Sequence, residues 1–354
     1  MLKKAAGLLL VGASMAFWVS CATTSSHYLY AALPTANDIV AYREDPNSGV
    51  LTLLSVSPIA AGPAVEALAL HPSKKFLYAA NSFENDISLF TINTSGVLTE
   101  VTPRHKTDTA PTLLAMNSGG SFLYVGNSGS NDISVFSIDA SSGALTQVGT
   151  PLLLGLTPTN MRLSPSGNFL YVMGAGLPGN IEVFSLSAGV PNQVPVQVAQ
   201  VGTNPYGLAI DPGGAHLYVA NSLPDDSISE FTINSDGSLT ALSTIGGGTL
   251  SSPIALLIDN SGKYLYVANA GASNLSAYAI ASDGSLTLLT TNESVPTNAH
   301  PNFMVNDPTG KYVFVGNSSS PAIQSFSLDV GTGTLTAVTS YSVGSTPTSI
   351  VVVP

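Results

Sequence analysis

Tyr264-Leu265-Tyr266-Val267-Ala268-Asn269 is the stretch that decides the fold, because close copies of it recur along the whole chain. Each copy places an aromatic residue between hydrophobic neighbours, and the 354-residue chain contains seven of them. The aromatic residues are Tyr30, Tyr78, Tyr124, Tyr171, Tyr218, Tyr266 and Phe314, at steps of 48, 46, 47, 47, 48 and 48 residues. A period in this range is typical of the four-stranded blade of a β-propeller. The sequence therefore predicts an all-β, seven-bladed β-propeller with four antiparallel strands per blade.

The fifth unit shows how one repeat divides into strands. Residues 205–210 form the expected inner strand, and residues 216–220, 227–233 and 238–242 form the next three. Asp211-Pro212-Gly213-Gly214 and Asn234-Ser235-Asp236-Gly237 separate them. Proline presets a turn and glycine tolerates positive φ, so these segments are predicted to be tight turns.

The two ends of the chain complement one another. Residues 27–54 supply the last three strands of a unit, whereas residues 347–354 match an inner strand and then stop. We therefore expect the C-terminal strand to complete blade 1, which would remove two exposed sheet edges. The propeller is predicted to span residues 27–354.

Composition excludes one class of partner. The chain carries 10 Lys and Arg against 21 Asp and Glu, a net charge of −11, and 9% of its residues are charged. Phosphate binding needs a clustered basic surface, so nucleic acid is not an expected partner. The 33 Gly and 23 Pro fit many short strands joined by turns.

The N-terminus has the pattern of an export signal. Lys3 and Lys4 precede an apolar run over residues 5–19, which is short for a membrane span. Cys21, the single cysteine, follows residues that resemble the cleavage box of a bacterial lipoprotein. We expect residues 1–20 to be a signal peptide, Cys21 to be lipidated and residues 21–26 to form a tether. The expected location is the periplasm, outer membrane or cell surface; cleavage near Ala22 and simple secretion is the alternative.

The repeats resemble a known family. Phe122-Leu123-Tyr124-Val125-Gly126-Asn127 and its copies are similar to the Tyr-Val-Thr-Asn repeats of propellers and to the seven-bladed lactonases of the 6-phosphogluconolactonase type. The resemblance covers residues 27–354. It implies hydrolysis of a lactone beside the axial channel, where members of the family carry His and Arg near the prolines that open inner strands. This chain departs from that pattern at Pro158-Thr159-Asn160, Pro205-Tyr206-Gly207, Pro253-Ile254-Ala255 and Pro301-Asn302-Phe303.

Three residues are candidates for catalysis. Lactone hydrolysis needs a cation to polarise the carbonyl and a base to activate water. Arg162 stands where the other inner strands carry Ala, Leu or Val, and it is either a channel-facing anion ligand or one half of an ion pair between blades, with Glu66 as a candidate partner. His300 precedes Pro301 at the predicted channel mouth, where it is a candidate base or a solvated loop residue. Glu66, near the start of the inner strand of blade 2, is a candidate base or the counterion of Arg162.

Five asparagines form a second candidate group, because each ends the second strand of its blade. They are Asn81, Asn127, Asn221, Asn269 and Asn317. Such a ring would bind a polar ligand such as a sugar, or it would cap turns by bonding to the backbone. No grouping of His, Asp, Glu or Cys has metal-ligand spacing, so the sequence predicts no metal site and no cofactor.

Three functions fit these features. The first is an exported lactonase acting on a small-molecule lactone at the channel mouth. The second is a non-catalytic binding or scaffold propeller whose partner is a protein or glycan of the cell envelope, and the third is a structural surface-layer component. In each case we expect a monomer that meets the membrane only through a lipid anchor.

Overall fold

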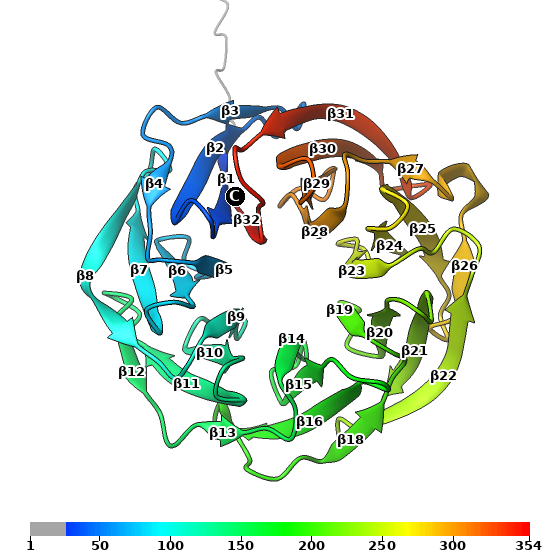
Figure 1. Cartoon of the computed structure of the whole chain (residues 1–354), viewed down its shortest axis with the longest axis horizontal. Coiled ribbons are helices and arrows are strands. Elements are labelled where there is room, and N and C mark those ends of the chain that lie inside the picture. Colours follow the sequence, from blue (N-terminus) through cyan, green and yellow to red (C-terminus); the bar gives the residue numbers. More distant parts are fainter. Residues whose placement is uncertain (1–25) are drawn as a thin grey trace, which may run out of the picture.

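Seven blades form a closed ring around a central channel (Figure 1). The structure, a computed structural model, describes residues 26–354. The signal peptide, Cys21 and nearly all of the predicted tether lie outside the described residues. Between residues 26 and 354 the one helical element is the 3₁₀ turn η1 (Thr290–Asn292), and no helix there is long and apolar enough to cross a bilayer. The predicted all-β fold is confirmed.

The inner two strands of every blade are regular. The inner strands that surround the channel are β5 (Val65–Leu70), β9 (Pro111–Met116), β14 (Pro158–Leu163), β19 (Pro205–Ile210), β23 (Pro253–Ile258), β28 (Pro301–Asn306) and β32 (Ser349–Val353). The second strands carry the repeated aromatic residue and are β1 (His27–Leu33), β6 (Phe76–Asn81), β10 (Phe122–Asn127), β15 (Phe169–Gly174), β20 (His216–Asn221), β24 (Tyr264–Asn269) and β29 (Tyr312–Asn317). Each second strand is antiparallel to its inner strand.

The outer half of the blades is less uniform. The third strands are β2 (Asp38–Glu44), β7 (Asp86–Ile92), β11 (Asp132–Ile138), β16 (Asn180–Ser187), β21 (Ser227–Ile233), β25 (Asn274–Ile280) and β30 (Ala322–Asp329). The outer strand is continuous in three blades, as β8 (Leu98–Lys106), β22 (Leu239–Gly246) and β31 (Thr334–Ser342). In the others it is split into β3 (Leu51–Leu53) and β4 (Ile59–Ala60), β12 (Leu145–Gln147) and β13 (Leu152–Leu153), β17 (Val190–Pro191) and β18 (Gln197–Gln200), and β26 (Leu286–Leu288) and β27 (Val295–Pro296).

Blade 1 is assembled from both ends of the chain. The C-terminal strand β32 pairs antiparallel with β1, with Tyr28 opposite Val353 and Ala32 opposite Ser349. Figure 1 shows the red strand beside the blue one at the inner edge of the ring. The sheet order β3-β2-β1-β32 confirms the predicted closure.

The hydrophobic core is divided among the seams, as we call the contacts between neighbouring blades. Seven clusters of buried side chains each draw on two adjacent blades. The six repeated tyrosines are fully buried there, and all six donate their hydroxyl to a glycine carbonyl of the next blade at 2.6–3.0 Å. The residue that marks each repeat in the sequence therefore also donates the hydrogen bond that joins one blade to the next.

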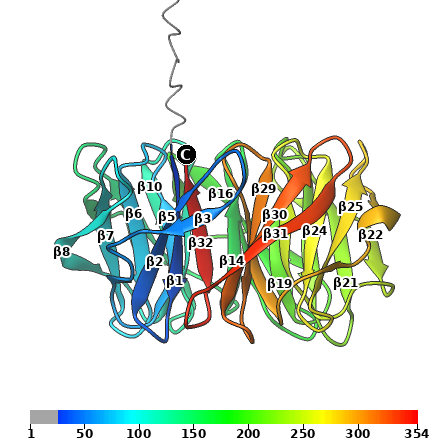
Figure 2. The ribbon, with the colours of Figure 1, turned by 90° about the horizontal axis from the view of Figure 1, so that it is seen from above.

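The ring has two distinct faces, which Figure 2 shows at the two edges of the upright strands. At the front face the inner strands begin and the second strands end, since Asn81 lies opposite Val65. At the back face lie the turns that follow the inner strands, together with the start of β1 and the end of β32. The front face holds the larger part of the channel.

Candidate functional site

A cavity of about 660 Å³ occupies the front of the channel. Its mouth is a ring of one residue per blade, which is the second residue of the inner strand in six blades and the residue just before β32 in blade 1. The ring consists of Glu66, Thr112, Thr159, Tyr206, Ile254, Asn302 and Thr348. Deeper walls are formed by apolar residues such as Leu68, Leu208 and Met304. Glu66 and Arg162 are the two charged residues in the described lining.

Arg162 lies deeper in the channel than the mouth ring. It lines both the front cavity and a second cavity of about 280 Å³ toward the back face, so its side chain stands between the two. Nη1 donates to the Oδ1 of Asn160 at 3.1 Å and to the carbonyl of Met161 at 3.0 Å. Arg162 is exposed to the channel, yet the surrounding wall desolvates its guanidinium and lowers the pKa of Arg162. An arginine nevertheless keeps its charge.

The ion pair considered for Arg162 is not formed. No carboxylate of residues 26–354 lies within 4.0 Å of its guanidinium, and Glu66 is carried two blades away. A cation without a protein counterion in a concave wall is suited to hold an anion or a polarised carbonyl. Of the two roles that the sequence left open, the geometry favours the channel-facing one.

Glu66 is half-buried in the mouth ring, on β5. Desolvation raises the pKa of its carboxyl above the ordinary value, and a hydrogen bond from Ser82 opposes part of that rise. A carboxyl whose pKa is raised is better matched to removing a proton from water than an ordinary surface acid. Glu66 and Arg162 therefore line one cavity, as a candidate base and a candidate cation.

His300 is at the front face but outside the lining of the cavity. It precedes β28 with φ of 57°, and its side chain is exposed. Its carbonyl accepts the Ser318 amide at 2.9 Å, the same backbone bond that residues 64, 110, 204 and 252 make in other blades. The backbone geometry of His300 is thus that of the repeated turn, and a catalytic role for its imidazole stays a prediction.

The five asparagines of the predicted polar ring are all fully buried within their blades. In four of them Nδ2 donates to side chains of the adjacent third strand: Asn81 to Asp86 and Ser88, Asn127 to Asp132 and Ser134, Asn221 to Ser227 and Ser229, and Asn269 to Asn274 and Ser276. Asn317 donates instead to the carbonyl of Val315. None of the five lines the front cavity, and a ligand-binding role for them stays a prediction. In four blades these bonds join the front ends of the second and third strands.

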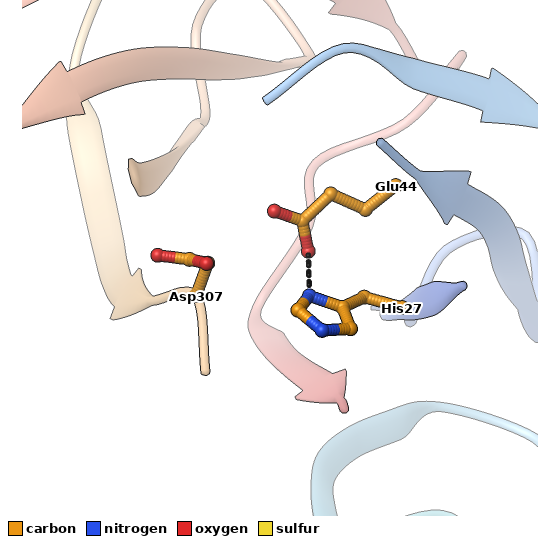
Figure 3. A group of neighbouring side chains, drawn as sticks. All are labelled: His27, Glu44 and Asp307. Atoms are coloured by element: carbon orange, nitrogen blue, oxygen red, sulfur yellow. Dashed lines mark ion pairs between the residues drawn. The ribbon is translucent and has the colours of Figure 1, made fainter. Parts of the chain in front are cut away.

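One group of residues that could hold a metal was missed from the sequence. His27, Glu44 and Asp307 come together at the back face, and all three are buried (Figure 3). His27 and Glu44 start β1 and end β2, whereas Asp307 follows β28 near the other end of the chain. Spacing along the sequence gives no sign of such a group, because the closure of the ring creates it.

Comparison with protein families identifies the class to which this ring belongs. The model of the family described as "Lactonase, 7-bladed beta-propeller" matches residues 60–157, 102–189, 174–290 and 240–352. These overlapping ranges cover most of the chain. The chain therefore belongs to the family of seven-bladed β-propeller lactonases.

Solved structures show the same fold at low sequence identity. A protein of Bacteroides fragilis, provisionally described as a 6-phosphogluconolactonase, is 22% identical with a TM-score of 0.81, over 94% of this chain and 99% of the other. A periplasmic gluconolactonase of Pseudomonas aeruginosa is 20% identical with a TM-score of 0.76, over 93% and 99% of the two chains. No protein of curated function matches this chain. The identities are low enough that the structural likeness establishes the fold alone.

Proposed function

We propose that this protein hydrolyses a lactone in its front cavity, with Arg162 as the cation and Glu66 as the base. The observation that carries the proposal is the guanidinium of Arg162, which faces the cavity with no carboxylate of residues 26–354 paired to it. Membership of the lactonase family supports the reaction class. The structural likeness to a gluconolactonase suggests sugar lactones as the first substrates to test.

The reaction assigns one task to each residue. Glu66 accepts a proton from a water molecule, whose oxygen attacks the lactone carbonyl carbon. Arg162 stabilises the negative charge that develops on the carbonyl oxygen. The ring C–O bond then breaks, the leaving oxygen takes up a proton, and the products are a carboxylate and a hydroxyl on one open chain. Asn160, which accepts a hydrogen bond from Arg162, positions the guanidinium.

The test is pH-stat hydrolysis of a lactone panel, including 6-phosphogluconolactone, by the purified protein. We expect Arg162→Ala to lower kcat/KM by about 10²–10³-fold, the usual effect of removing a group that stabilises an oxyanion. Arg104→Ala is the matched control, because Arg104 pairs with Glu100 on the outer strand β8 and is remote from the channel. Equal activity of wild type and Arg162→Ala on a hydrolysed lactone would remove Arg162 from the mechanism.

The pH profile tests Glu66 separately. A base acts when deprotonated, so kcat/KM should fall as the pH drops through the raised pKa of Glu66. The acidic limb should therefore lie above the usual range of a glutamate, and Glu66→Gln should lower kcat/KM by about 10²–10⁴-fold. His300→Ala belongs in the same series, since it decides whether the imidazole at the front face contributes.

A non-catalytic binding propeller is the second candidate, favoured by the uncharged character of most of the cavity wall. Apart from Glu66 and Arg162, the described lining consists of apolar or neutral polar residues. In that reading the ligand is a carboxylate-bearing molecule of the cell envelope that Arg162 binds without turnover. A cavity that binds aldonates but hydrolyses no lactone of the panel would favour this function.

We propose further that the protein is exported and anchored by a lipid on Cys21. The basic residues and apolar run before Cys21 support export. Residues 21–26 reach at most ~20 Å when extended, and β1 begins at the back face. An anchored ring would thus turn its cavity mouth away from the membrane. Detergent-phase partitioning that is lost in Cys21→Ser would support the anchor, and unchanged partitioning would contradict it.

A further inference from the structure

Glu44 occupies a position that is aliphatic in the six other blades. It ends the third strand of blade 1, opposite the first residue of β1. The residues that make the same backbone contact elsewhere are Ile92, Ile138, Leu186, Ile233, Ile280 and Leu328, and each packs in the seam with the preceding blade. Blade 1 therefore places a carboxyl where the repeat calls for a hydrocarbon.

This carboxyl is buried without satisfying its oxygens. Glu44 is 1% exposed, and neither carboxylate oxygen has a hydrogen-bond partner among residues 26–354. The Nδ1 of His27, itself 5% exposed, also has none, although it lies 3.4 Å from Oε2 of Glu44. Burying such groups without partners is unfavourable, so buried charges are normally paired or coordinate a metal.

A third ligating group faces this pair from blade 7. Asp307 is 1% exposed, and one ligand atom from each of Asp307, Glu44 and His27 lies within 4.8 Å of the others. Figure 3 shows the carboxylate of Asp307 across a gap from the other two side chains. Asp307 is held there by the amides of Thr309, Lys311 and Tyr312, the kind of outer hydrogen bonding that supports metal-ligating carboxylates.

We propose that His27, Glu44 and Asp307 form a binding site for a divalent transition metal, Zn²⁺ in the first place, at the seam between blades 7 and 1. Two ligands of a tetrahedral zinc, each at about 2.0–2.1 Å, are about 3.3–3.4 Å apart. The separation of His27 Nδ1 and Glu44 Oε2, 3.4 Å, already equals that edge. Asp307 supplies the third ligand after a small approach, and a water molecule completes the four.

The donor set selects the kind of metal. An imidazole nitrogen with two carboxylates suits zinc and its neighbours, whereas calcium and magnesium prefer six or more oxygens. Glu44 lines a surface cavity of about 510 Å³ at the back face, together with Ser26, Arg43 and Asp45. The site is separate from the front cavity and does not depend on lactone hydrolysis.

The other blades show why this junction alone brings the three groups together among residues 26–354. The residues equivalent to Asp307 are His71, Asn117, Ser164, Asp211 and Asp259, and in each case the following blade has an aliphatic residue at the position of Glu44. Those blades also supply the substitutions with which to test the site. Glu44→Leu introduces the residue that blades 4 and 7 have at the equivalent position. His27→Ser and Asp307→Asn each introduce the residue that blade 3 has at the equivalent position.

The experiment is calorimetric titration of the full chain, freed of metal by chelation, with ZnCl₂ and with MgCl₂. We expect one Zn²⁺ per chain, little or no Mg²⁺, and a melting temperature at least ~3 °C higher with saturating Zn²⁺. Glu44→Leu and His27→Ser should each lose the bound zinc, and Asp307→Asn should weaken it at least ~10-fold. Glu44→Leu without metal should melt no lower than metal-free wild type, because it restores the apolar seam.

His216→Phe is the matched control. His216 lies 3.0 Å from Asp211 and is the other described histidine paired with a carboxylate, and Phe is the residue of that position in blades 2–4. This variant should keep the zinc. Absence of zinc binding by wild type, or binding that survives both Glu44→Leu and His27→Ser, overturns the proposal; if Glu44→Leu does not fold, His27→Ser and Asp307→Asn decide it.

Discussion

Six seams of the ring are joined in one way and the seventh in another. In the six, the buried tyrosine of one blade donates to the glycine carbonyl of the next, as Tyr218 does to Gly284 at 2.8 Å. In the closing seam, between blades 7 and 1, the equivalent residue is Phe314, which is just as buried but has no hydroxyl. There Tyr312 donates to the carbonyl of Asn47 at 2.6 Å, and the amide of Leu51 donates to Tyr341 at 2.7 Å.

The comparison between the seams distinguishes two roles of the repeated tyrosine. Its ring fills the seam, which Phe314 also does, and its hydroxyl ties neighbouring blades together. Where the chain closes on itself, its two ends are joined by the pairing of β1 with β32 inside blade 1 and by the bond between Leu51 and Tyr341 across the seam. The Tyr312 bond has counterparts in two other seams, from Tyr28 to Thr94 and from Tyr264 to Gly331. The same seam is the one in which Glu44 replaces an aliphatic residue, so it has departed from the repeat in several positions at once.

Removing the closing strand should have the largest effect. Deletion of residues 350–354 removes four of the five paired positions of β32 and leaves the edge of β1 open. We expect insoluble protein, because open strand edges promote aggregation. The soluble fraction and the melting temperature are the measurements, and deletion of Pro354 alone is the control. A soluble truncation that melts like the wild type would contradict closure by β32.

A methyl group added at one of the six seams outside the closing seam should have an intermediate effect on stability. Gly237 has φ of +85°, and a Cβ there would lie 2.3 Å from the ring of Phe169. We expect Gly237→Ala to destabilise the protein by about 3 kcal/mol through overpacking and left-handed backbone strain. Gly167→Ala shares the positive φ, +72°, but meets nothing within 4 Å, and should cost about 1 kcal/mol. Equal melting temperatures of the two variants would show that the seam yields to the methyl group.

Removing the tyrosine hydroxyl from one seam, or adding it to the closing seam, should have the smallest effect on stability. Tyr218→Phe removes the donor to Gly284 and should cost about 1–2 kcal/mol, since a buried carbonyl loses its partner. Phe314→Tyr places a hydroxyl opposite the carbonyl of Gly49 and should gain about 0.5–1 kcal/mol. Urea denaturation measures both. If Phe314→Tyr is destabilising, the closing seam has no room for the tyrosine-to-glycine hydrogen bond that the other six seams share.

The fold was predictable because the repeat fixes it seven times over. In the fifth unit the first three strands were predicted to within a residue, with 205–210, 216–220 and 227–233 observed as Pro205–Ile210, His216–Asn221 and Ser227–Ile233. The outer strand was predicted as 238–242 and is Leu239–Gly246. It is exposed on one side and carries a weaker alternation, so neither its length nor its splitting in four blades follows from the sequence pattern.

The candidate site was predictable only where a residue departs from the repeat. Arg162 was found because six equivalent positions are Ala, Leu or Val. The same comparison applied to the end of the third strand would have singled out Glu44 among Ile and Leu. What it would not have supplied is Asp307, because that neighbour follows from the closed ring and not from spacing along the chain.

The pairing of β1 with β32 also sets an order of events during synthesis. Tyr28 is made among the first residues of the ring, but its partner Val353 is among the last residues of the chain. At a synthesis rate of about 5–20 residues per second, roughly 15–60 s pass between the synthesis of β1 and that of its partner strand. The strands of blades 2 to 7 are all made in the meantime, whereas blade 1 still lacks its inner strand. The first blade to be made is therefore the last to be completed, and until then the open edge of β1 can pair with other chains.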